Sequence, residues 1–394
     1  MIDNDDDEIN FIHEPFIQLS QEIRELGLTN IQRIPAPPAP LEFYRDYVSA
    51  NRPVIIEGAV NHWPAIDLWP NNSYLLSRLG DNLISVAVTP DGLADSINST
   101  SGRFVLPCQE KWKFSDFLNK LINDSKINSS KQPLTSLALT SGIVYAQQQN
   151  SSFHQEFSIL NSDISLFDWA NEAFGSEPEA VNLWIGSSLS ATSPHLDHYE
   201  NLYTVITGEK IFLLWPPSDA HWMNQHMVKQ AIWKRKDMDD NNGGFELAND
   251  DNSEEIPWSN IDIKNEWKLN QCEEDEAEID NFNNNEVTGK SSIDNEEKNN
   301  HLLSLVIDPQ LRHQHAPPIC VRLRAGETLY LPSLWYHGVL QGEDATGKTI
   351  AINQWYDMEF DSKYAYHQFV NKQSQQAHQK LTMVKQKSQP VSEN

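Results

Sequence analysis

Residues 193–217 read SPHLDHYENLYTVITGEKIFLLWPP, and this stretch decides the fold class. Two runs rich in β-branched and aromatic residues flank a Thr-Gly-Glu turn signal, which is typical of paired β-strands. Similar short runs recur on both sides, at 180–188 (AVNLWIGSS), 326–333 (GETLYLPS), 335–341 (WYHGVLQ) and 349–356 (TIAINQWY). Many short strands without intervening helices favour a sandwich or barrel over a parallel α/β sheet. We therefore predict a mainly β fold with flanking helices.

The rest of the chain predicts a division into four parts. Apolar spacings predict helices over 16–27 and 111–123, and β-branched runs predict strands at VIIEG, LISVAVTPDG and GIVYAQQQ. The expected parts are an acidic tail, helix and Pro-rich link (1–40), an α/β part packing on the barrel (41–179), the barrel (180–360), and a C-terminal helix and tail (361–394).

The acidic residues are concentrated in one segment that interrupts the strands. Of the 56 Asp and Glu, 20 fall between Asp237 and Asn300, against 4 Lys and Arg there. This segment lacks sustained periodicity, so we expect a disordered surface insertion at about 237–300, in which Trp258 of EEIPWSN docks on the core. The bland interpretation is a tolerated loop expansion, and a second hypothesis is recruitment of a basic partner.

The amino-acid composition narrows the binding partners and the cellular compartment that we expect for this protein. A net charge of −27 repels phosphate backbones, so we expect no direct nucleic-acid binding. Three scattered cysteines give no disulfide framework, and the acidic start MIDNDDDEIN is unlike a secretory signal. No apolar run approaches a membrane span. We expect a cytoplasmic protein, with the nucleus as a second compartment and no membrane partner.

His195 and Asp197 begin the chemical interpretation. Separated by one residue, they leave the same face of a strand, where a third ligand would complete the two-His, one-carboxylate face of non-haem iron(II) oxygenases. Such a spacing also arises by chance. Lys210 enters a hydrophobic strand, where a buried ammonium needs an anion such as a dicarboxylate. His337 lies on an apolar strand and, taken alone, fits a core position better than a ligand.

The sequence resembles the JmjC family of 2-oxoglutarate oxygenases. The resemblance rests on HLDHYENLYTVITGEKIFLLWPPSD, GETLYLPSLWYHGVLQ and IAINQWYDMEFDSKYAY, and extends through EFYRDYVSANRPVIIEGAVNHWPA, SVAVTPDGLAD and VYAQQQNSSF. It covers most of the chain except the acidic insertion and both tails. The fold that it implies is a double-stranded β-helix, the jelly-roll or cupin-like JmjC barrel.

The resemblance also implies the site. His195, Asp197 and His337 would be the iron(II) ligands, and Lys210 would pair with the distal carboxylate of 2-oxoglutarate, the co-substrate used with O2. The other implied pocket residues, which fit packing roles as well, are Thr192, Tyr145, Asn201, Tyr203 and Asn353.

The activity that the resemblance implies is C3-hydroxylation of a lysine in a protein, with a developmentally regulated GTP-binding protein as partner. Alternatives are a histone lysine demethylase, a peptidase directed at methylated lysine or arginine, and an inactive JmjC-fold interaction protein. Asp357 and Glu359 are candidates for receiving the cationic lysine, or are solvated acids. By the resemblance, Ser49 stands at the position of an intermolecular cysteine of the family, so a covalent dimer through this site is not available and a non-covalent homodimer is left open.

Overall fold

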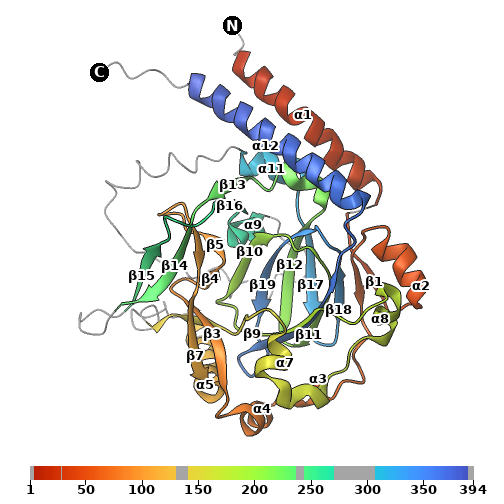
Figure 1. Ribbon diagram of the computed structural model, residues 1–394, viewed down its shortest axis with the longest axis vertical. Helices are drawn as coiled ribbons and strands as arrows, with labels where there is room; N and C mark the ends of the chain where they lie inside the picture. Colours follow the sequence, from red (N-terminus) through yellow and green to blue (C-terminus); the bar gives the residue numbers. More distant parts are fainter. Residues whose placement is uncertain (1–3, 28, 130–140, 237–243, 270–306, 389–394) are drawn as a thin grey trace.

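The structure is a computed structural model that describes residues 4–27, 29–129, 141–236, 244–269 and 307–388. Two β-sheets form a jelly-roll sandwich, confirming the predicted fold class (Figure 1). The six-stranded sheet runs in the order β1 (Gln32–Ile34), β2 (Val54–Ile56), β18 (Thr328–Leu331), β11 (Tyr199–Thr207), β20 (Thr349–Asp357) and β9 (Ala180–Gly186). The five-stranded sheet runs β17 (Ile319–Arg324), β12 (Glu209–Trp215), β19 (Tyr336–Gly342), β10 (Ala191–His195) and β4 (Leu93–Ala94).

The central strands are buried on both faces, which explains their nearly continuous apolar sequences. Tyr203 of β11 packs in the core with Phe212 and Leu214 of β12, while Leu202 and Ile206 point into a second cluster outside the sheet. Successive strand side chains alternate between faces. Polar residues of β11, β12, β19 and β20 that lie an even number of positions from an inward-facing residue therefore also face the interior of the sandwich.

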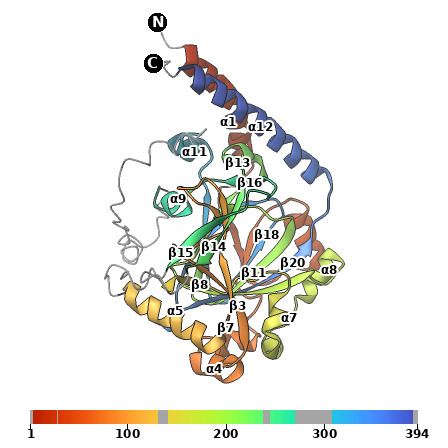
Figure 2. The same ribbon diagram turned by 60° about the vertical axis from the view of Figure 1, so that its left-hand side comes forward.

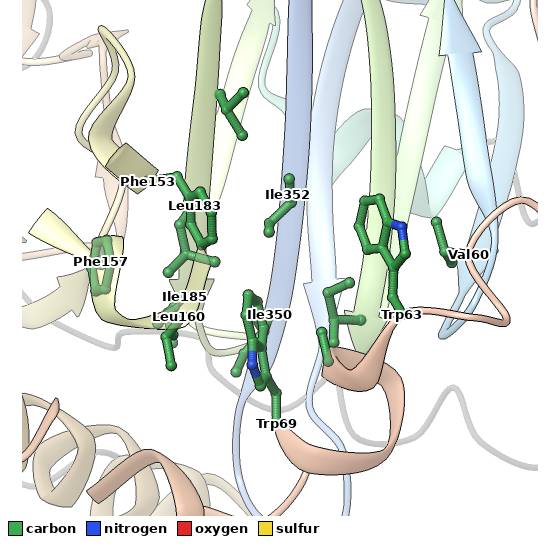
Figure 3. Close-up of a cluster of buried hydrophobic side chains, with 14 of the residues drawn as sticks. Val60, Trp63, Trp69, Phe153, Phe157, Leu160, Leu183, Ile185, Ile350 and Ile352 are labelled. Atoms are coloured by element: carbon green, nitrogen blue, oxygen red, sulfur yellow. The ribbon is translucent and has the colours of Figure 1, made fainter. Parts of the chain in front are cut away.

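Residues before 180 cover the outer face of the six-stranded sheet. Trp69 and Phe153 pack against Leu183, Ile350 and Ile352 of β9 and β20 (Figure 3). The covering elements are α2 (Pro40–Phe43), the π-helix η1 (Tyr44–Val48), α3 (Pro64–Leu68), α4 (Asn72–Leu79), α7 (Ser152–Glu156), the 3-10 helix η2 (Ser158–Asp163) and α8 (Asp168–Phe174). Strands β1, β2 and β4 also come from this part of the chain, so it contributes to both barrel sheets.

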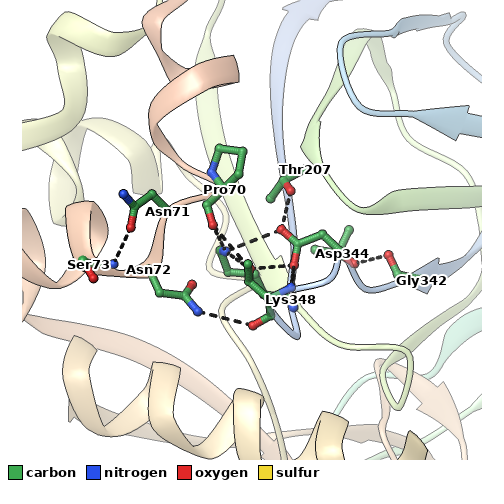
Figure 4. Close-up of polar contacts among 10 residues, drawn as sticks. Pro70, Asn71, Asn72, Ser73, Thr207, Gly342, Asp344 and Lys348 are labelled. Atoms are coloured by element: carbon green, nitrogen blue, oxygen red, sulfur yellow. Dashed lines mark hydrogen bonds and ion pairs between the residues drawn. The ribbon is translucent and has the colours of Figure 1, made fainter.

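The turn between β19 and β20 is tied to this cover by a buried lysine. Lys348 Nζ donates to Pro70 O (2.9 Å) and lies 3.5 Å from Asp344 Oδ2, which also accepts from Thr207 Oγ1 (Figure 4). Thr207 ends β11, so the network joins three parts of the chain. Its cation has a carboxylate partner, unlike the other buried lysine described below.

A three-stranded sheet corrects one sequence prediction. Its order is β7 (Cys108–Lys113), β3 (Leu83–Thr89) and β8 (Ile143–Tyr145), and helix α5 (Phe114–Ser129) follows β7 directly. The helix predicted from Lys111 is therefore wrong at its start. Residues 108–113 alternate between half-buried and exposed and pair with β3, so cross-strand pairing overrides the helical spacing there.

Residues 244–269 are folded, which corrects the expectation of a disordered insertion over 237–300. They form β15 (Phe245–Asn249), β16 (Ile256–Ser259) and α9 (Ile263–Leu269). β15 joins a four-stranded sheet with β14 (Gln230–Arg235), β6 (Phe104–Leu106) and β5 (Ser96–Ile97), and β16 pairs with β13 (Gln225–Val228). The other residues of the expected insertion lie outside the described residues.

The two terminal helices lie side by side at one end of the molecule (Figures 1 and 2). They are α1 (Asn4–Glu25) and α12 (Ser362–Ser388), and both contact the 3-10 helix η3 (Pro217–His221). Phe16 and Ala377 share a small core with Trp222 and Ile307, near α11 (Pro309–His315). The helix predicted for 16–27 thus begins earlier, within the expected acidic tail. None of the described helices has the length and apolarity needed to cross a bilayer.

Candidate metal centre

His195, Asp197 and His337 converge on one point between the two sheets. His195 is the last residue of β10 and lies opposite His337 of β19 in the strand register. Asp197 Oδ2 lies 4.0 Å from His195 Nε2 and 3.7 Å from His337 Nε2. One ligand atom from each residue lies within 4.8 Å of the others, which forms a possible metal-binding triad.

The route by which the chain assembles this triad differs from the prediction of a shared strand face. β10 ends at His195 and β11 begins at Tyr199, so Asp197 lies in the short link that crosses from the five-stranded to the six-stranded sheet. Its backbone oxygen accepts a hydrogen bond from Leu334 N (3.0 Å), which holds the link against the loop before β19. The carboxylate is placed by a crossover and not by strand alternation.

Both imidazole rings are held by backbone oxygens of their own strands. His195 Nδ1 lies 2.9 Å from Ser193 O, and His337 Nδ1 lies 3.0 Å from Trp335 O. Because a carbonyl oxygen only accepts, each Nδ1 carries the proton and each Nε2 keeps its lone pair. Burial lowers the pKa of His337 to about 4. Two imidazoles whose Nδ1 atoms are held by carbonyl oxygens, together with a carboxylate, fit iron(II).

Lys210 is a buried lysine that contacts Tyr145, a residue of the same cavity as the triad. Its side chain is 1% exposed, and Nζ donates to Tyr145 Oη (3.0 Å) and Gln341 Oε1 (2.5 Å). Burial lowers the pKa of Lys210 to about 7, and no carboxylate of the described residues pairs with it. A buried ammonium without an anion is unfavourable. The position therefore fits the carboxylate of a small ligand.

The two predicted pocket asparagines contact each other across β11 and β20. Asn353 Nδ2 donates to Asn201 Oδ1 (3.3 Å), and Asn353 Oδ1 accepts from Trp184 Nε1 (2.8 Å). Tyr203, on the same face as Asn201, packs edge-on against Phe212 with ring centroids 5.1 Å apart. Burial keeps the pKa of Tyr203 well above its ordinary value, so its hydroxyl stays protonated.

One cavity of about 490 Å³ unites these side chains. Eight of the nine predicted site residues line it: Tyr145, Thr192, His195, Asp197, Asn201, Tyr203, His337 and Asn353. The ninth, Lys210, does not line the cavity itself but donates a hydrogen bond to Tyr145, which does. The structure thus brings the predicted residues together, and their roles remain predictions. A metal at the triad would face open space for further ligands.

Trp258 closes the cavity over the first histidine of the triad. Its indole stacks on the His195 ring, with centroids 5.9 Å apart and planes at 6°, and packs against Phe104 at 4.5 Å. Its Nε1 donates to Ser193 Oγ (3.0 Å), and the carbonyl of the same serine holds His195 Nδ1. The expectation that Trp258 docks on the core is confirmed, and it docks at the candidate metal site.

Sequence reasoning did not predict Gln341, Ser193 or Trp184, of which only Gln341 left a usable signal. Gln341 lies four residues after His337 on the same strand, so period-two alternation places both on one face. Ser193 and Trp184 left none, because each makes its hydrogen bond to a residue far away in the sequence, Trp258 and Asn353 respectively. Asp357 and Glu359, the candidates for receiving a lysine, are exposed and do not line the cavity, which agrees with the alternative interpretation as solvated acids.

Comparison with known proteins agrees with this geometry. Residues 40–362 match the model of the Cupin-like domain family. The chain is 37% identical to "Lysine-specific demethylase JMJ32" of Arabidopsis thaliana over 89% of each chain. It is 34% identical to "Bifunctional peptidase and (3S)-lysyl hydroxylase JMJD7" of Homo sapiens, over 85% of this chain and 86% of that protein.

"JmjC domain-containing protein E" of Dictyostelium discoideum is also 34% identical, over 93% of this chain and 95% of that protein. The family match over residues 40–362 spans the triad and the segment 244–269. The chain therefore belongs to the cupin-like JmjC oxygenase family.

Proposed function

We propose that this protein is an Fe(II)- and 2-oxoglutarate-dependent hydroxylase that acts on C3 of a lysine side chain in a protein substrate. The observation that carries the proposal is the pairing of two site features. A triad of two imidazoles and a carboxylate lines a cavity with Tyr145, and Tyr145 contacts the buried Lys210, which has no carboxylate partner among the described residues. One of the relatives with high coverage is named a (3S)-lysyl hydroxylase, which supports the choice of reaction.

The roles of the chain's own residues follow from this arrangement. Iron(II) and 2-oxoglutarate, when bound, supply the oxidation that inserts one oxygen atom of O2 into a C–H bond, releasing succinate and carbon dioxide. His195 Nε2, His337 Nε2 and the Asp197 carboxylate would hold the metal on one face. Lys210 would bind the distal carboxylate of the co-substrate, with Tyr145 donating a hydrogen bond beside it.

The cavity wall keeps the substrate near the metal and limits water. Trp258 covers His195, and Trp184 and Trp355 line the same cavity. Thr192, Asn201 and Asn353 supply polar groups between these aromatic surfaces. A cavity with apolar walls and a few placed polar groups is suited to orient a side chain. The substrate carbon that lies nearest the metal then decides the product.

N-demethylation is the second candidate, because another relative with high coverage is named a lysine-specific demethylase. It would use the same metal face but oxidise a methyl carbon on nitrogen, so the product would lose formaldehyde. Peptide cleavage, which the name of the human relative includes, would need no co-substrate oxidation. The three reactions differ in their products and can be separated by one experiment.

The experiment incubates the protein with iron(II), ascorbate, 2-oxoglutarate and a pool of peptides, each with one central lysine, in plain and methylated forms. Tandem mass spectrometry should find plain peptides that have gained one oxygen on lysine. The amount of succinate formed should equal the amount of hydroxylated peptide. Formaldehyde from methylated peptides alone would establish demethylation instead. Truncated peptides without 2-oxoglutarate would establish proteolysis. His337→Ala serves as the control without metal-dependent turnover.

The partner proposals are narrower. We propose a GTP-binding protein as the physiological substrate and a non-covalent homodimer as the assembly, in the cytoplasm with the nucleus as a second compartment. Ser49, which follows η1, is exposed and cannot form a disulfide. Sedimentation under reducing and oxidising conditions should give the same mass. A dimer that dissociates on reduction would contradict this assembly.

A further inference from the structure

A carboxylate outside the triad faces the same cavity. Asp95 stands between β4 and β5, where the chain leaves the barrel sheet and enters the four-stranded sheet. Its backbone has φ +54°, a left-handed conformation that is uncommon for a residue other than glycine. Such backbone strain persists only where the surrounding structure enforces it, and it clusters at functional sites. The conformation keeps Asp95 on the cavity wall with His195 and Asp197.

The Asp95 carboxylate has little compensation for its charge. Gln147 Nε2 donates to its Oδ2 (3.1 Å), and Ser193 Oγ donates to its backbone oxygen (2.6 Å). No lysine or arginine of the described residues forms an ion pair with it. Burial raises the pKa of this carboxyl, against the opposing effects of His195 and Gln147. A partly buried carboxylate in this state is stabilised when a cation arrives.

The surroundings of Asp95 also favour an organic cation. Three indole rings line the same cavity, from Trp184, Trp258 and Trp355. Trp355 stacks on Tyr199, with ring centroids 4.8 Å apart and planes at 3°. The faces of such rings attract ammonium groups, and the attraction grows when water is excluded. Carboxylate and aromatic walls together match the head and stem of a lysine side chain.

We propose that Asp95 binds the ammonium group of the substrate lysine and is a specificity-determining residue of this enzyme. The proposal rests on the proposed function and deepens it. In C3-hydroxylation the nitrogen stands at the far end of the side chain from the reacting carbon, so it needs an anion apart from the metal ligands. Asp95 lines the cavity without belonging to the triad. Asp357, which is exposed at the end of β20, takes no part.

The test measures binding without turnover. The full-length protein is loaded with Mn(II) and N-oxalylglycine, an unreactive analogue of 2-oxoglutarate. The tightest-binding plain lysine peptide of the pool described above is fluorescently labelled and compared with its norleucine counterpart, which has nearly the same shape but no charge. Dissociation constants are measured for the wild-type protein, Asp95→Asn, Asp95→Glu and Asp357→Asn. Asp95→Asn keeps an oxygen that can accept from Gln147.

Wild-type protein and Asp357→Asn should prefer lysine over norleucine by about 10-fold, a typical value for a partly buried charge pair. Asp95→Asn should reduce this preference to less than about 3-fold, mainly by weakening lysine binding, and Asp95→Glu should restore part of it. Mn(II) affinity is measured in parallel. An Asp95→Asn protein that retains the preference, or loses it only together with metal binding, would overturn the inference.

The binding result and the chemical result are separable. Lysine preference that depends on Asp95, without any peptide gaining oxygen, would uphold this inference and refute the proposed hydroxylation. If peptides gain oxygen but Asp95→Asn leaves the preference for lysine over norleucine unchanged, the proposed hydroxylation is upheld and the inference about Asp95 is refuted. Equal weakening of the lysine and norleucine peptides in Asp95→Asn would assign Asp95 a structural role only, which also contradicts the inference.

Discussion

Two regions form the candidate metal site, and they are stabilised in different ways. Strands β10, β12 and β19 carry His195, Lys210 and His337, and they are stabilised by their own burial in the barrel. Residues 244–269 carry Trp258, and their strands pair with β13 and β14 outside the barrel sheets. Their helix α9 is held by the buried ion pair of Glu266 with Arg312 (2.5 Å).

The difference between the two regions shows that the groups for binding and the residue that covers them come from separate parts of the fold. The barrel supplies the groups that would bind metal and co-substrate, on strands whose apolar residues force them inward. The segment 244–269 supplies a cover whose place depends on docking. Replacements in the barrel should therefore abolish binding, and replacements in the segment should weaken it. The predictions below test this gradation, from the largest expected effect to the smallest.

Removing a barrel ligand should have the largest effect. In His337→Ala the triad loses one of its two imidazoles, so Co(II) or Fe(II) affinity should fall by at least about 100-fold. His198→Ala is the matched control, because His198 is exposed and packs on Phe360 (6.2 Å between ring centroids). Calorimetric titration measures both. Equal losses in the two variants would show that the triad is not the metal site.

Replacing Lys210 should affect the co-substrate and leave the metal bound. Lys210→Met removes the charge at similar length, so the dissociation constant of 2-oxoglutarate should rise roughly 10- to 100-fold in Mn(II)-loaded protein. Lys348→Met is the control, since that buried lysine pairs with Asp344 away from the cavity. Wild-type 2-oxoglutarate affinity in Lys210→Met would remove this lysine from the site.

The cover should matter less than the ligands. Trp258→Ala removes the ring stacked on His195 and the donor to Ser193, so metal affinity should fall by about 10-fold. Trp258→Phe should lose less, because it keeps a stacked ring. Trp233→Ala, in β14, serves as the control, as Trp233 packs on Phe245 and does not line the cavity. Unchanged metal affinity in Trp258→Ala would show that residues 244–269 do not contribute to metal binding.

The smallest predicted effect is the pH dependence of 2-oxoglutarate affinity, which reports the protonation of Lys210. Free Lys210 has a pKa lowered to about 7, and a bound carboxylate raises the pKa of this ammonium. Above pH 7, binding of 2-oxoglutarate must then take up a proton, so affinity should fall about five-fold between pH 7 and pH 8 and level off below pH 7. Calorimetry in buffers of different ionisation enthalpy measures the uptake. Affinity that rises with pH would contradict a protonated Lys210 in the complex.

The sequence predicted the strands of the barrel region well because their signals are local. The inward position of Lys210 follows from its place in an apolar strand, whereas His337 was assigned as a ligand through the family resemblance and Asp197 is placed by the link between β10 and β11. The segment 244–269 carries no such signal, since polar strands are stabilised by partners distant in sequence. Asp95 was missed for a related reason: aspartate is common in turns, and its left-handed backbone conformation leaves no mark in the sequence.

The central claim is that one metal ion binds between the sheets with a co-substrate anchored by Lys210. A crystal structure of the full-length protein with Fe(II) and 2-oxoglutarate under anaerobic conditions, measured at the iron absorption edge, tests it most directly. We predict an anomalous peak within bonding distance of His195 Nε2, the Asp197 carboxylate and His337 Nε2, with the distal carboxylate at Lys210 Nζ. A peak bonded elsewhere, or a co-substrate whose carboxylate does not contact Lys210, would contradict the account.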